Sequence, residues 1–115
     1  MPMEYKVEQL EDRRAVFTVS GRLDAATAAE FKNGLKTAAA EFATFVVVDL
    51  SALTFIDSSG LRALVSGLKA LREKDGGLAL TGIGEQVRVA MELTRLDRIF
   101  PVYADRASAL DSFTG

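Results

Sequence analysis

The residues of this chain with the clearest chemical potential form the run Asp57-Ser58-Ser59-Gly60, which directly precedes a strongly amphipathic segment. Asp and Ser are both favoured as the N-cap of a helix, where a side-chain oxygen accepts a hydrogen bond from a free backbone N–H. A hydroxyl at a helix start is also exposed, and the free N–H groups and the helix dipole favour a phosphate there. The run is therefore either a helix cap or a phosphorylation site at Ser58, and composition alone favours the cap.

Two other patterns suggest chemistry but fit it less well. Gly82-Ile83-Gly84 follows an apolar run and Asp105 lies about twenty residues later, as in a dinucleotide-binding fingerprint. Val87 stands where the third glycine of that fingerprint belongs, and it would crowd the contact between helix and strand. Ser66 and Lys69 spell the motif S-x-x-K, but they lie inside a helical pattern, and neither S-D-N nor K-T-G occurs in the chain. We interpret the first pattern as an ordinary loop and the second as chance, and we predict no cofactor.

The composition restricts the chemistry further. The 115 residues include no Cys and no His, which removes the usual zinc ligands, the thiol nucleophile and the imidazole base. We therefore expect neither a metal site nor an enzyme. The 14 basic and 16 acidic residues are scattered and give a net charge of -2, which does not suit a nucleic-acid backbone or an anionic membrane. A protein partner is the better expectation.

The balance of residues predicts one ordinary globular domain over residues 1–115, since 49% are hydrophobic and 26% are charged. The longest apolar stretches fall far short of the ~20 residues that cross a bilayer. We expect a cytoplasmic protein and, by default, a monomer.

The first half of the chain predicts a hairpin followed by a helix. Tyr5 and Val7 alternate with charged residues, and the apolar run 15–19 leads to a strand end at Ser20-Gly21. Thr27 and Glu30 have the spacing of a capping box, and Asp24 is the rival N-cap. A helical stripe then continues through Asn33-Gly34, although that pair could also signal a turn; its apolar members are Phe31, Leu35, Ala38 and Phe42.

The second half alternates strands and helices. The unbroken apolar run 45–48 predicts a central strand covered on both faces, and the turn after it spans residues 49–61 and leads directly into a helix. This helix has an apolar face and stops at Gly76-Gly77. The pattern then predicts a short strand at 78–80 and a helix over 85–96. The last extended segment, 99–103, contains Pro101 and is therefore expected at the edge of the sheet. Asp105 caps a final helix. The order ββαβαβαβα predicts a mixed, mostly parallel sheet flanked by helices, with its strand-to-helix turns along one edge.

At this point the residues resemble a known family. Asp57-Ser58-Ser59-Gly60-Leu61 after a hydrophobic strand, with Gly21-Arg22-Leu23-Asp24 at the end of an earlier one, is similar to the STAS domain family. The best-known single-domain members are bacterial anti-sigma factor antagonists. The resemblance extends over nearly the whole chain, because the order of elements, the length and both motif positions match.

The resemblance implies a partner switch without catalysis. In that family, the Ser or Thr directly after the Asp of the turn is phosphorylated by a serine kinase that is also the anti-sigma factor; by position that residue is Ser58. The unphosphorylated antagonist would bind this kinase and free a sigma factor, and a phosphatase acting on phosphorylated Ser58 would restore binding. A phosphate near Asp57 and Asp24 would oppose docking by its charge. The partner-binding residues that we predict are Asp24, Asp57, Ser58, Ser59 and Gly60, with Arg62 as a further candidate that the resemblance does not imply.

Arg62 departs from the family pattern, since many members have a small residue after Gly-Leu. Arg62 either contacts a phosphoserine or selects a partner, or it merely keeps an amphipathic helix soluble together with Lys69 and Arg72. Other STAS roles remain as alternatives to sigma regulation: a scaffold in stress signalling or a regulatory subunit of a membrane transporter.

Overall fold

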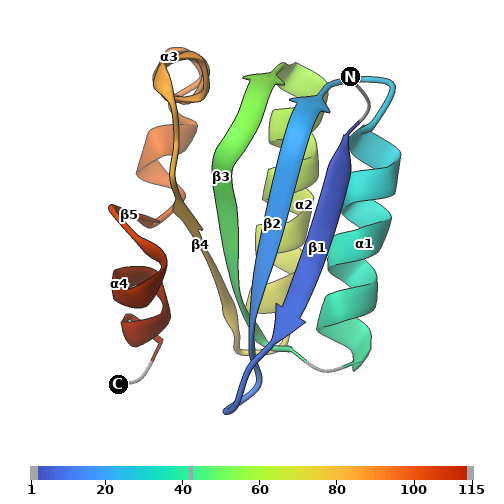
Figure 1. Ribbon diagram of the computed structural model, residues 1–115, viewed down its shortest axis with the longest axis vertical. Coiled ribbons are helices and arrows are strands. Elements are labelled where there is room, and N and C mark those ends of the chain that lie inside the picture. The colour runs from blue at the N-terminus through green and yellow to red at the C-terminus, as the bar shows by residue number, and fades with distance from the viewer. Residues whose placement is uncertain (1–2, 42, 114–115) are drawn as a thin grey trace.

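A mixed sheet forms the centre of the molecule in the computed structural model, which describes residues 3–41 and 43–113 (Figure 1). Within this described part the sheet has five strands in the order β1-β2-β3-β4-β5. Strand β1 is antiparallel to β2, and every other neighbouring pair is parallel, which confirms the predicted fold class. The elements are β1 (Glu4–Gln9), β2 (Arg14–Leu23), α1 (Ala28–Glu41), β3 (Phe45–Ile56), α2 (Ser58–Arg72), β4 (Gly77–Thr81), α3 (Glu85–Leu93), the 3-10 turn η1 (Leu96–Arg98), β5 (Val102–Tyr103) and α4 (Arg106–Asp111).

The two strands that lead to the Asp57 turn are longer than predicted. β2 continues past Ser20-Gly21 to Leu23, and β3 continues to Ile56 through residues that we predicted as a turn. Both extensions have the same cause: the strands stay paired in parallel, past two register irregularities, until Leu23 lies opposite Ile56. Burial of the apolar side chains along this extension favours the strand over a loop. Of the long predicted turn, only Asp57 therefore lies between the end of β3 and the start of α2.

Alternating side chains divide the core into two layers. Phe17 and Val48 point to the face covered by α1 and α2, whereas Val16 and Val47 point to the face where Ala109 of α4 packs. Figure 1 shows α1 and α2 lying side by side along one face of the sheet. The central strand is thus covered on both faces, as its unbroken apolar run predicts.

Helix α1 forms through the Asn33-Gly34 pair. Phe31, Leu35 and Ala38 are buried as predicted, while Phe42 lies outside the described residues. A Cβ at Gly34 would come within 2.7 Å of the Tyr5 ring, which stacks on Phe17 with ring centroids 4.8 Å apart. Gly34 is therefore a close-packing position and not a turn.

The C-terminal third differs from prediction in its boundaries. α3 ends at Leu93, short of the predicted Leu96, because Arg95 adopts a left-handed conformation with φ 64° that a helix cannot continue through. β5 covers only two residues of the predicted segment 99–103, and it lies at the sheet edge as expected. Asp105 caps α4 as predicted, because its carboxylate accepts a hydrogen bond from Ser108 N at 2.8 Å. In the described part of the chain, no helix combines the length and apolar character needed to cross a membrane.

Candidate functional site

Asp57, and not Ser58, is the N-cap of α2. Its Oδ1 accepts a hydrogen bond from Gly60 N at 3.1 Å, and its backbone is extended. Ser58 is the first residue of the helix and is exposed, while Ser59 is half-buried. Among the described residues, none is hydrogen-bonded to the Ser58 hydroxyl. Since Asp57 satisfies the cap, the Ser58 hydroxyl has no structural task at this position.

Gly60 is a close-packing position at the start of α2. It lies inside the helix, where an added Cβ would come within 2.5 Å of Leu23 O and 2.7 Å of Ile56 Cγ1. The Asp57 N–H also donates to Leu23 O, at 3.2 Å. Gly60 therefore allows the first turn of α2 to start directly against the end of β2, and this contact fixes the height of Ser58 above the sheet.

Asp24 shapes the neighbouring turn between β2 and α1. Its Oδ1 accepts from Ala26 N at 3.0 Å, and its Oδ2 lies 3.6 Å from Arg22 Nε in an ion pair. The Thr27 hydroxyl accepts from Asp24 N at 3.0 Å and donates to Arg22 O at 2.8 Å. The predicted capping box of Thr27 and Glu30 is thus wrong, because the Thr27 hydroxyl is committed to the preceding turn. The Asp24 charge is partly balanced by Arg22.

Two further contacts hold the strand ends together. The Gln86 side chain of α3 accepts from Ile56 N and donates to Ile56 O, both at 2.8 Å, and so acts as a strand partner where β4 has ended. The Arg22 guanidinium lies 4.2 Å from the centroid of the Phe55 ring. Neither contact is visible in the sequence, because a Gln on a polar helix face and an Arg before a turn look like ordinary solvated residues.

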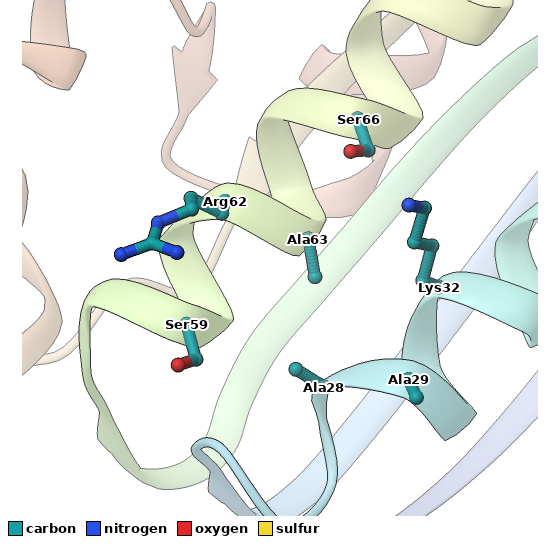
Figure 2. A pocket seen from close by; sticks show the side chains of 7 residues that line it. All are labelled: Ala28, Ala29, Lys32, Ser59, Arg62, Ala63 and Ser66. Carbon is teal, nitrogen blue, oxygen red and sulfur yellow. The ribbon is translucent and has the colours of Figure 1, made fainter.

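Two grooves border the exposed side of α2. One has a volume of about 260 Å³ and lies between α1 and α2; Figure 2 shows Lys32 reaching from α1 toward α2, while Arg62 extends away from α1. The other has a volume of about 400 Å³ and lies between α2 and the segment that ends α3, with Ser58 and Arg62 on its α2 wall and Thr94 and Leu96 opposite. Arg62 borders both grooves. Of the predicted partner-binding residues, the structure thus places Asp57, Ser58, Ser59, Gly60 and Arg62 on one helix start, with Asp24 on the adjoining turn.

Comparison with known proteins decides the family. The STAS domain model matches residues 5–109. The chain belongs to the STAS domain family. The anti-sigma-F factor antagonist RsfB of Mycobacterium tuberculosis is 32% identical over 104 residues, which cover 88% of this chain and 82% of RsfB. The anti-sigma-B factor antagonist of Listeria monocytogenes is 26% identical over 102 residues, covering 89% of this chain and 90% of the relative.

The three-dimensional structure is also similar to those of known anti-sigma factor antagonists. The crystal structure of an anti-sigma factor antagonist from Mycobacterium paratuberculosis matches this STAS domain with a TM-score of 0.84 and 31% sequence identity. The match covers 99% of this chain and 96% of that one. Fold and sequence therefore agree over nearly the full length of both proteins.

The buried carboxylate of this STAS domain lies on the opposite face, away from the Ser58 turn. Asp49 Oδ2 is 2.7 Å from Arg106 Nε of α4, and Asp49 Oδ1 accepts from Ser51 N at 2.9 Å. Burial alone would raise the pKa of Asp49, but the hydrogen bonds from Ser51 and Arg106, together with the Arg106 charge, lower the pKa below its ordinary value. Asp49 thus anchors α4 to the sheet.

Proposed function

We propose that this protein is an anti-sigma factor antagonist, whose unphosphorylated form binds an anti-sigma factor with serine kinase activity and so frees a sigma factor. The names of its relatives support the antagonist role. The structural observation that carries the switch is the exposed Ser58 hydroxyl, which stands at a helix start while Asp57 alone provides the cap. A kinase could reach and modify this hydroxyl without disturbing the fold.

Phosphorylation at Ser58 would oppose docking through charge and bulk. A phosphate carries about -1.5 to -2 charge at pH 7. It would add to the carboxylate of Asp57 on a surface that loses water when the partner binds, and a like charge desolvated in an interface is costly. A phosphatase acting on Ser58 would restore the binding surface. In this scheme the protein is a substrate and a ligand, and it catalyses nothing itself.

The modification can be tested directly. The protein is incubated with ATP and each anti-sigma kinase of its source organism, and the phosphate is mapped by mass spectrometry. We expect one phosphate on Ser58, its loss in Ser58→Ala and its retention in Ser59→Ala. A phosphate on Ser59, or no modification by any of these kinases, would overturn the proposed switch.

The binding half of the proposal needs a separate measurement. Calorimetry compares the affinity of the same kinase for the unmodified protein, for Ser58→Ala and for the phosphorylated form. We expect tight binding of the first two and at least a tenfold loss for the third, with release of the sigma factor only in the first two cases. Equal affinity of all three forms would contradict the switch even if Ser58 is phosphorylated.

A further inference from the structure

The groove between α2 and the end of α3 has features that a phosphorylation site alone does not require. One stripe of α2 forms its first wall, with Ser58 at the mouth and Arg62, Val65 and Lys69 following at helical spacing. Leu96 belongs to the opposite wall. Ser58 is therefore the first α2 residue of a groove wall that continues to Lys69, about three helical turns along the helix.

The groove is positively charged although the chain has a net charge of -2. Among the described residues that line it, Arg62 and Lys69 are the charged ones, and none is acidic. Glu92 of α3, two residues before the lining residue Thr94, already has a partner, because Arg88 Nη1 lies 2.8 Å from its Oε1. The cations of the groove thus lack a carboxylate from its own walls, which suits a negatively charged ligand.

The groove also offers apolar contact area. Val65 and Leu96 are half-buried in its two walls. Leu93, next in sequence to the lining residue Thr94, is 80% exposed. A single exposed leucine is common, but together with apolar side chains in both walls of the adjoining groove it indicates a surface that a partner covers.

We infer that this groove receives a short acidic segment of the anti-sigma partner, with an apolar side chain between Val65 and Leu96 and carboxylates on Arg62 and Lys69. This assignment rests on the proposed function and adds the chemistry of the contact. Arg62 then has two possible anionic partners, because a phosphate on Ser58 stands one helical turn before it. Phosphorylation of Ser58 would therefore oppose the acidic segment in two ways. The phosphate would pair with Arg62, and its negative charge would lie in the wall of the groove that receives the segment.

Charge reversal tests the groove. The kinase that binds the wild-type protein is titrated in a calorimeter with Arg62→Glu and Lys69→Glu. Lys32→Glu, in the other groove, and Arg72→Glu, beyond this one on α2, are the matched controls. We expect at least a tenfold weaker affinity for each groove variant and less than a twofold change for each control. Circular dichroism checks that all four variants are folded.

A photo-crosslinking residue in place of Leu96 identifies the occupant. We expect the crosslinked peptide of the partner, sequenced by mass spectrometry, to contain acidic residues beside an apolar one; a basic peptide or no crosslink would overturn the inference. Groove variants that bind as well as the controls would also overturn it while leaving the proposed function intact. Failure of the wild-type protein to bind any anti-sigma kinase would instead refute the proposed function.

Discussion

Ser58 and Arg62 lie four positions apart at the start of α2, so their side chains are neighbours on the same helix face. A phosphate on Ser58 would have a guanidinium within reach without any movement of the backbone. The N-terminal end of the helix adds a second favourable field for its charge. The same residue that departs from the family pattern is thus placed to act on the phosphate.

This placement predicts a shifted pKa for the phosphate. In the Ser58-phosphorylated protein, Arg62 stabilises the dianion, so the second pKa of the phosphate lies below its ordinary value of about 6. Arg62→Ala should raise that pKa, whereas Lys69→Ala, two turns farther along the helix, should not. Phosphorus NMR titration of the three phosphoproteins measures this. Identical titration curves for wild type and Arg62→Ala would show that Arg62 does not contact the phosphate.

Gly60 predicts a loss of stability when it gains a side chain. A methyl group would collide with backbone at Leu23 O, which cannot move aside as a flexible side chain could. We expect Gly60→Ala to lower the free energy of unfolding by about 2 kcal/mol, within the range for overpacked sites. Gly84→Ala is the matched control, because an added Cβ there meets no atom within 4 Å. Urea denaturation compares them, and equal midpoints would contradict the proposed close contact.

At the scale of elements, the ion pair of Asp49 and Arg106 attaches α4 to the sheet and predicts a pH-dependent stability. The lowered pKa of Asp49 means that its contribution is fully present above its unfolded-state value, near 3.8, and is lost as pH falls through the lower pKa of the folded state. We expect Asp49→Asn to cost about 1 kcal/mol at pH 7, since Arg106 stays half-exposed and keeps its water.

The measurement is the difference in unfolding free energy between wild type and Asp49→Asn from pH 7 down to pH 3. The difference should stay constant to about pH 4 and then shrink. Asp105 and Glu85 also have lowered pKa values, but they titrate in both proteins and cancel in the difference. A difference that does not change with pH would show that the charge of Asp49 is unimportant for the attachment of α4.

The elements also show what the sequence could and could not predict. Periodicity predicts every helix and strand of the observed order, because burial of apolar faces dominates local propensity here. Periodicity misses the extension of β3 to Ile56, because the length of this strand is determined by its pairing with β2 and not by the local sequence. Of the candidate site, the Asp57 turn is visible as a motif. The opposing wall at Leu96 and the Gln86 contact are not, because only the tertiary fold brings them to α2.

At the scale of the whole molecule, the fold gathers the residues of the candidate site at one edge of the sheet. The parallel strands β2, β3 and β4 all end there, and the turns that follow them lead into α1, α2 and α3. Each turn is fastened by its own contacts: Asp24 with Thr27, Asp57 with Gly60, and Gln86 with Ile56. Ser58 thus stands on a rigid platform, as a binding surface without loop rearrangement requires.

This rigidity predicts that phosphorylation changes the surface and leaves the fold intact. The Ser58 hydroxyl is exposed and unbonded among the described residues, so a phosphate displaces no contact, and the helix start favours its charge. We expect the phosphorylated protein to unfold at the same temperature as the unmodified one or a few degrees higher. Amide chemical-shift changes should be confined to the Asp57 turn, α2 and the groove wall at Leu96. A lower unfolding temperature, or shift changes across β1 and α4, would instead indicate a switch that acts through the fold.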